Sequence, residues 1–243
     1  MPIDLTFIVW ADTHCGYAQR FGRDDQRYRI AEQIGALAGW PYPSWIGGRV
    51  GLPAFVAHLG DMVEGGPPPG HEAERDYFLH LKSQLRLPQY ELLGNHDATA
   101  PMGHWFERRY HAPSYSFDMG GVRFVFLRVD FGPTPQSGAG EHVRDDQLDW
   151  LKQDLESLDA AVPVVLFVHS PIERCTNSAE LLDVLAPHHV VLSMAGHLHR
   201  QPKLPKGALV RRLHQRRKLF VSQVCHVVYP VNPFAPAKIL PQR

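Results

Sequence analysis

Five short segments of the sequence carry aspartate, histidine or asparagine side chains at spacings that suit metal binding. The segments are Asp12-Thr-His14, Gly60-Asp61, Gly94-Asn95-His96-Asp97, His169 and Gly196-His197-Leu-His199. Carboxylates, imidazoles and an amide oxygen, without a thiolate, form a donor set that favours Mn, Fe, Zn, Ni or Co and disfavours Ca. The sequence therefore predicts a transition-metal site built from the far ends of the chain.

The number of candidate ligands indicates two metal ions rather than one. The set comprises Asp12, His14, Asp61, Asn95, His169, His197 and His199, which is more than one ion that keeps an open position can use. Two ions that share a bridging carboxylate would accommodate all of them. Two divalent ions also carry more positive charge than two carboxylates cancel, which favours a bound hydroxide and an incoming phosphate. Such a pair can clamp the attacking and leaving oxygens of a displacement at phosphorus.

Each of these segments directly follows an apolar run that is expected to form a strand. The expected strands lie at 5–10, 54–59, 90–93, 164–168 and 190–194. Several runs are continuously apolar, as is typical of strands covered on both faces. Ligands of open α/β sheets bind just beyond the carboxyl ends of strands. We therefore expect the polar side chains to converge at one edge.

The spacing within two segments gives a second argument for convergence. In an extended chain, residues i and i+2 point to the same side. The Asp12/His14 pair and the His197/His199 pair are therefore each expected to chelate one centre. The glycine before Asp61, like those before Asn95 and His197, permits a sharp turn and a close approach of backbone to a bound species.

Helical patterns separate the expected strands and indicate an α/β fold. Apolar residues recur at helical spacing over 30–37, 78–85 and 148–158, and Asp145 and Asp146 stand at the start of the last pattern. A further strand is expected at 122–129, and the strand run near 114–130 implies that part of the sheet is antiparallel. The 243 residues are 44% hydrophobic and 21% charged, values typical of a soluble globular chain. We expect one domain over 1–243, with an extended proline-rich tail at 230–243.

Charge and apolar patterning indicate which binding partners and which cellular location to expect. The formal net charge is +0, so no overall field attracts the chain to nucleic acid or to an anionic membrane. The apolar runs fall far short of the ~18 residues that a membrane-spanning helix needs, and the N-terminus has no basic region or cleavage site typical of a secretion signal. The three widely spaced cysteines do not form a disulfide framework. These observations predict a cytoplasmic protein, with the oligomeric state left open.

The order and composition of the five segments resemble the calcineurin-like metallophosphoesterase superfamily. All five motif blocks are present between residues 12 and 199. The resemblance implies a four-layer αββα sandwich with mixed sheets and a dinuclear metal centre at one edge. It also implies metal-dependent hydrolysis of phosphate esters, with a bridging hydroxide as the nucleophile.

The resemblance also assigns a role to each motif residue. One ion would be held by Asp12, His14 and His199, and the other by Asn95, His169 and His197, with Asp61 bridging the two. His96 would contact the phosphate and help the leaving group to depart, and Asp97 would orient His96. An imidazole near neutral pKa suits that proton donation, although His96 as an additional metal ligand stays open as an alternative.

Three further features have both a functional and a structural interpretation. Glu64 has counterparts in the family, and the sequence leaves open whether it contacts a ligand. A stretch from Arg200 to Lys218 contains eight basic residues and no acidic one. It begins directly after His199, so Arg200 is expected to contact substrate, and the stretch would attract an anionic substrate. The alternative is a solvated hairpin. The long loops at 40–53, 64–70 and 131–143 are either functional or surface connections.

Three functional classes follow from these observations. The first is a phosphoesterase acting on a small phosphorylated substrate, either a monoester or a diester, with cyclic nucleotides and nucleic acids as competing substrates of the same fold. The second is a non-catalytic scaffold, which the complete ligand set argues against. The third is a nucleic-acid binder acting through the basic stretch, which the zero net charge and the absence of a known binding motif disfavour.

Overall fold

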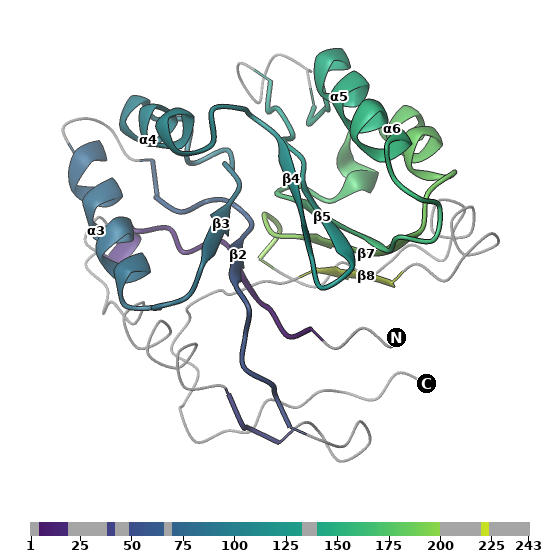
Figure 1. Ribbon diagram of the computed structural model, residues 1–243. Coiled ribbons are helices and arrows are strands. Elements are labelled where there is room, and N and C mark those ends of the chain that lie inside the picture. Colours follow the sequence, from purple (N-terminus) through teal and green to yellow (C-terminus); the bar gives the residue numbers. More distant parts are fainter. Residues whose placement is uncertain are drawn as a thin grey trace, which may run out of the picture.

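The fold is described by a computed structural model that covers residues 5–18, 38–41, 49–65, 70–132 and 140–199, together with the backbone of 220–223. Two β-sheets lie at its centre (Figure 1). The smaller sheet contains three short parallel strands in the order β1 (Ile8–Trp10), β2 (Val56–His58) and β3 (Gln89–Glu91). The five segments with candidate ligands begin at the ends of strands from both sheets.

The larger sheet contains five strands in chain order. They are β4 (Tyr115–Met119), β5 (Val122–Phe126), β6 (Val164–Val168), β7 (Val190–Ala195) and β8 (Phe220–Gln223). β4 and β5 form an antiparallel hairpin, and every other neighbouring pair is parallel. The prediction that part of the sheet is antiparallel is therefore confirmed. Because β6 and β7 are parallel, their carboxyl ends bring His169 and His197 to the same edge.

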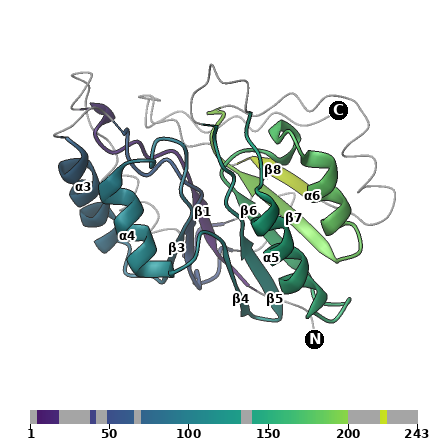
Figure 2. The same cartoon turned by 90° about the horizontal axis from the view of Figure 1, so that it is seen from above.

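Helices cover the outer face of each sheet, which makes four layers (Figures 1 and 2). α3 (His71–Ser83) and α4 (Ala100–Tyr110) pack on the smaller sheet. α5 (Asp145–Glu156) and α6 (Ser178–Leu185) pack on the larger sheet, and a short 3-10 helix, η1 (Ile172–Arg174), precedes α6. The predicted αββα sandwich with mixed sheets is confirmed.

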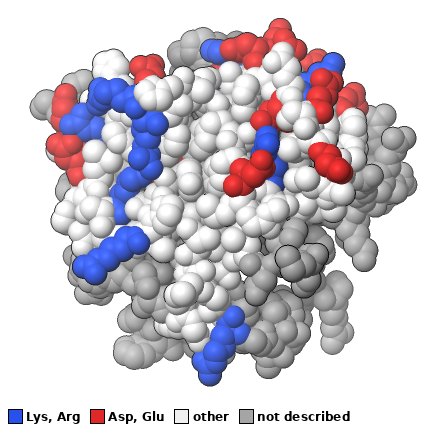
Figure 3. All heavy atoms as spheres, in the orientation of Figure 1, with Lys and Arg blue, Asp and Glu red and all other residues white. Residues whose placement is uncertain are grey.

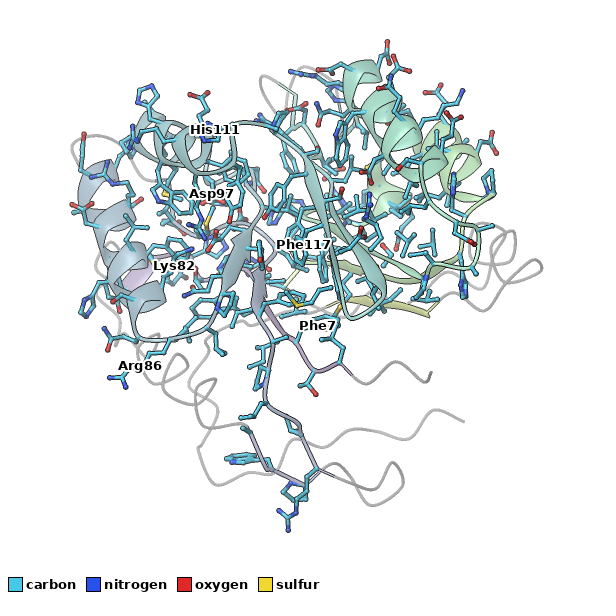
Figure 4. All side chains as sticks on the ribbon, in the orientation of Figure 1. Phe7, Lys82, Arg86, Asp97, His111 and Phe117 are labelled. Atoms are coloured by element: carbon cyan, nitrogen blue, oxygen red, sulfur yellow. The ribbon has the colours of Figure 1, made fainter. Side chains whose placement is uncertain are left out.

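Successive side chains of a strand point to opposite faces of its sheet, and the apolar ones form the three interfaces between these layers. In β6, Val164 and Leu166 face the α5–α6 layer, whereas Phe167 faces the other sheet. The interface between the sheets is rich in aromatic rings, with Phe7 stacked at 5.2 Å on Phe55. Figure 4 labels Phe7 in this interface. Burying a Phe or Leu side chain stabilises a fold by about 1.5–3 kcal/mol, so this interface holds the two halves of the site together.

The spacing of apolar residues predicts two of the four described α-helices. The expected pattern over 148–158 becomes α5, whose first turn carries Asp145 and Asp146 as the helix dipole favours. The pattern over 78–85 belongs to α3, which begins earlier, at His71. α4 and α6 were not predicted. The expected helix at 30–37 lies outside the described residues, as do the basic stretch at 200–218 and the tail at 230–243.

The surface in the orientation of Figure 3 carries both signs of charge. Acidic side chains gather over α5, where Asp145, Asp146 and Asp149 lie, and basic side chains gather on the α3–α4 side, separated by a broad uncharged area. Among the described helices, none combines the length and the apolar character needed to cross a membrane.

Candidate metal centre

The predicted ligands from both sheets meet at one edge of the sandwich. Asp12, His14, Asp61 and His199 form one group in which each residue offers a ligand atom within 4.8 Å of the others. Asp61, His169 and His197 form a second such group. Asp61 is common to both groups. The structure thus brings together all four predicted imidazoles and both predicted carboxylates, with one carboxylate placed between two groups.

The backbone at these ligands is left-handed rather than extended. φ is 56° at Asp12, 43° at His14, 73° at His197 and 49° at His199. Residues i and i+2 share a side only in an extended chain, so the argument for a shared side at these two pairs is wrong. Asp12 and His14 still lie in one group, but His197 and His199 fall in different groups. Non-glycine residues in this region cost about 1 kcal/mol or more each, so the surrounding packing must hold them in place.

Gly60 is required by the way the two sheets meet at the site. Its φ is +96°, and a Cβ there would lie 2.6 Å from His169 Nδ1 and 2.7 Å from the Gly94 nitrogen. Its N–H donates to Nδ1 of the buried His58, at 3.2 Å. His58 is thus a core residue that fixes the turn before Asp61. The sharp turn predicted at this glycine is confirmed, and the groups that it approaches closely are His169 and Gly94.

The His14 ring is oriented by a carboxylate. Its Nδ1–H donates to Glu64 Oε2 at 3.0 Å, which turns Nε2 toward His199 Nε2 at 3.0 Å and Asp61 Oδ2 at 3.7 Å. A carboxylate on the far nitrogen of a ligating histidine fixes its tautomer and its orientation. Burial lowers the pKa of His14 to about 4, despite the opposing effect of Asp61, so the ring is neutral at pH 7. The question left open for Glu64 is answered: it contacts a candidate ligand.

The His169 ring is oriented by a backbone carbonyl instead. Its Nδ1–H donates to the Leu59 oxygen at 2.6 Å, and Nε2 lies 3.3 Å from Asp61 Oδ2 and 3.3 Å from Asn95 Oδ1. Burial acts to lower the pKa of His169, but Asp61, Asp12 and the Leu59 carbonyl together raise it to about 9, with Asp61 the largest of these. The same contact holds the pKa of Asp61 below its usual range although burial acts to raise it. A cation at this position would replace the His169 proton.

The donor set fits a pair of transition-metal ions. The orienting bonds occupy Nδ1 of His14 and of His169, so Nε2 of each ring is turned toward the shared Asp61. Asn95 adds an amide oxygen to the second group. His199 Nε2 meets Asp12 Oδ1 at 3.2 Å, and this carboxylate also accepts the His197 N–H at 2.9 Å. Nitrogen and oxygen donors of this kind suit Mn, Fe, Zn, Ni or Co.

His96 stands beside the ligands with one ring nitrogen already bonded. Its Nδ1–H donates to the Glu64 oxygen at 2.7 Å, and its backbone N–H donates to Asp61 Oδ1 at 2.9 Å. The ring lies edge-on to His14, with centroids 4.6 Å apart. Because Nδ1 is bonded to the Glu64 carbonyl, Nε2 is the ring nitrogen that could transfer a proton.

Asp97 contacts the backbone rather than the His96 ring. Its two oxygens accept the Val63 N–H at 3.0 Å and the Gly94 N–H at 2.8 Å. The prediction that Asp97 orients His96 directly is therefore wrong for this structure, because the Glu64 carbonyl is the partner of that ring. Burial raises the pKa of Asp97 to about 7, with Asp61 adding to the rise. Figure 4 labels Asp97 in the interior near α4, where it ties two loops of the site together.

A model of the calcineurin-like phosphoesterase family matches residues 5–201. The chain belongs to this family. It is a metal-dependent phosphoesterase. The resemblance inferred from the five motif blocks is thus confirmed over most of the chain.

The chain also resembles a solved structure. The chain is similar to the crystal structure of Phosphopantetheinyl Hydrolase (PptH) from Mycobacterium tuberculosis, with 14% sequence identity and a TM-score of 0.49, over 97% of this chain and 100% of that chain. No curated protein matches the chain.

Two site features lie beyond what the motifs could indicate. Glu141 lies 3.3 Å from His197 Nε2, and the Phe131 ring packs against His169 and His197. Both residues belong to the ends of the proline- and glycine-rich segment at 131–143, whose length was the only sequence signal. Arg200, expected to contact substrate, lies outside the described residues.

Proposed function

We propose that the chain hydrolyses small phosphate monoesters or diesters at a centre of two metal ions. The observation that carries this proposal is the position of Asp61, whose carboxylate belongs to both ligand groups. A shared carboxylate suits two neighbouring ions, and bound ions of this kind would polarise a phosphoryl oxygen and lower the pKa of a water nucleophile. Mn, Fe, Zn, Ni and Co are the candidate ions, since the donors are imidazole, carboxylate and amide.

His96 is the proposed general acid. Its Nδ1–H is held by the Glu64 carbonyl, so Nε2 is the nitrogen that would contact a phosphate or a leaving oxygen. A positioned acid that protonates the departing oxygen typically contributes about 10²–10⁴-fold in rate. Asn95, the preceding residue, would hold an ion through its amide oxygen, which lies 3.3 Å from His169 Nε2, and would also contact the substrate. Arg200 stays a proposed substrate contact.

The test is a phosphate-ester panel run on metal-free protein reconstituted with each candidate metal. We expect activity on p-nitrophenyl phosphate, bis-p-nitrophenyl phosphate or both, present only with metal and lost on chelation. Cyclic AMP and a short oligonucleotide added to the panel test the competing substrate classes. Protein that binds two ions and cleaves none of these esters would contradict the proposal.

A further inference from the structure

The segment that ends at Val143 is fixed at its base next to the second ligand group. Asp130 and His142 exchange two backbone hydrogen bonds, at 2.8 and 3.0 Å. The Asn177 side chain donates to the Val143 oxygen at 2.6 Å and accepts the Val143 N–H at 3.1 Å. The backbone of Glu141 is therefore held on both sides. The backbone oxygen of Glu141 also accepts the Thr176 N–H at 2.8 Å.

The Glu141 carboxylate lies between an arginine and a candidate ligand. Its Oε1 is 2.8 Å from Arg174 Nε, 2.7 Å from Arg174 Nη2 and 3.3 Å from His197 Nε2. The carboxylate is buried, whereas Arg174 is half-exposed on η1. A buried carboxylate without a partner is strongly destabilising. Arg174 therefore makes it possible for Glu141 to lie against the ring.

The Phe131 ring restricts the same histidine from another side. Its centroid is 5.4 Å from the His197 ring and 5.7 Å from the His169 ring. Apolar packing alone leaves a ring free to flip by half a turn, because both orientations have the same shape. A carboxylate at one nitrogen removes that freedom, since only one orientation presents an N–H to it.

We propose that Glu141, held by Arg174, is the positioning residue for His197. The carboxylate keeps the proton on Nε2 and leaves Nδ1 for a metal ion in the group that contains Asp61 and His169. This role rests on the proposed two-metal function. It is the counterpart of the Glu64 contact to His14 in the other group. Orienting partners of this kind typically change metal affinity by about 10- to 100-fold.

The test is a titration of metal-free protein with Mn²⁺, with affinities resolved by a competing chelator. Wild-type protein is expected to bind two ions. We expect Glu141→Ala to weaken one ion by about 10- to 100-fold and to leave the other within about twofold. Glu141→Gln keeps the shape and an acceptor oxygen, so it should recover part of the loss. It also remains informative if the alanine variant does not fold.

Two further variants separate positioning from a general structural effect. Arg174→Met should weaken the same ion as Glu141→Ala, because the carboxylate loses its counter-ion. Glu173→Gln removes an exposed neighbouring carboxylate and should change neither affinity. Circular dichroism and thermal unfolding of each variant monitor the fold. In the Mn²⁺-loaded protein, electron paramagnetic resonance should show loss of the coupled pair signal in Glu141→Ala.

The outcomes distinguish this inference from the proposed function. Wild-type protein that fails to bind two ions would contradict the two-metal function and the positioning role with it. Wild-type binding of two ions, with both affinities unchanged or equally weakened in Glu141→Ala and Glu141→Gln, would contradict the positioning role alone.

Discussion

The two sheets contribute different chemistry to the same site. The smaller sheet, with strands of three residues, supplies the carboxylates Asp12 and Asp61. The larger sheet supplies His169 and His197 from the ends of its neighbouring parallel strands β6 and β7. Both ligand carboxylates thus lie on one half of the sandwich, and two of the ligand imidazoles lie on the other. Neither half alone holds both ligand groups, so the aromatic interface between the sheets is also a requirement for the site.

The rings of His14 and His169 differ in protonation. Burial keeps His14, on the smaller-sheet side, neutral with a pKa of about 4. On the larger-sheet side, burial acts to lower the pKa of His169, but Asp61, Asp12 and the Leu59 carbonyl together raise it to about 9. His197, on the same side, has a pKa that is lowered chiefly by burial. A cation would therefore displace a proton from His169 but none from His14.

Asp61→Asn is expected to have the largest effect, because Asp61 is the carboxylate shared by the two halves. Losing several kcal/mol of transition-state stabilisation corresponds to a rate decrease of about 10³-fold or more. The affinity for both ions should fall together. Steady-state kinetics and elemental analysis check this. Loss of only one ion in this variant would show that Asp61 is not shared.

His96→Ala is expected to lower kcat by about 10²–10⁴-fold, since it removes the proposed general acid without removing a metal ligand. Two ions per chain should remain bound, as measured by elemental analysis. A leaving group of low pKa needs little protonation, so the defect should be smaller for p-nitrophenyl phosphate than for an alkyl phosphate. If His96→Ala empties the site, the residue is a ligand.

Asp97→Ala is expected to destabilise the protein more than to alter its chemistry. Its two oxygens accept the N–H groups of Val63 and Gly94, and each buried donor left without a partner costs about 1–3 kcal/mol. Chemical denaturation should therefore show a loss of about 2–6 kcal/mol. An unchanged unfolding free energy with lost activity would instead support a direct role of Asp97 in orienting His96.

The pH dependence of metal binding sharpens the contrast between His14 and His169. A ring with a raised pKa stays protonated up to about pH 9, so binding must release that proton. Affinity should rise by up to about tenfold per pH unit between roughly pH 6.5 and 9 and then level off. His199, whose pKa is raised chiefly by its bond to Asp12, acts in the same direction, whereas His14 releases no proton. Calorimetry in buffers of different ionisation enthalpy counts the protons. Affinity that is constant over this range would contradict the pKa assignment.

The sequence predicted the strands and the gathering of the polar residues at one edge better than the local geometry. Strands such as β6 and β7 were predictable because runs covered on both faces are continuously apolar. α4 was not, since Gly103 interrupts its pattern, and α6 is only eight residues long. The pairing of His197 with His199 was wrong because extended geometry ends where the strand ends. Glu141 was not predictable, because its position depends on contacts with Arg174 and His197, which are far away in sequence.

Anomalous X-ray diffraction from crystals loaded with Mn²⁺ tests the central claim most directly. The account predicts two anomalous peaks, one beside His14 and His199 and one beside His169 and His197, with an oxygen of Asp61 within bonding distance of both. A single peak, or two peaks of which only one contacts Asp61, would contradict it.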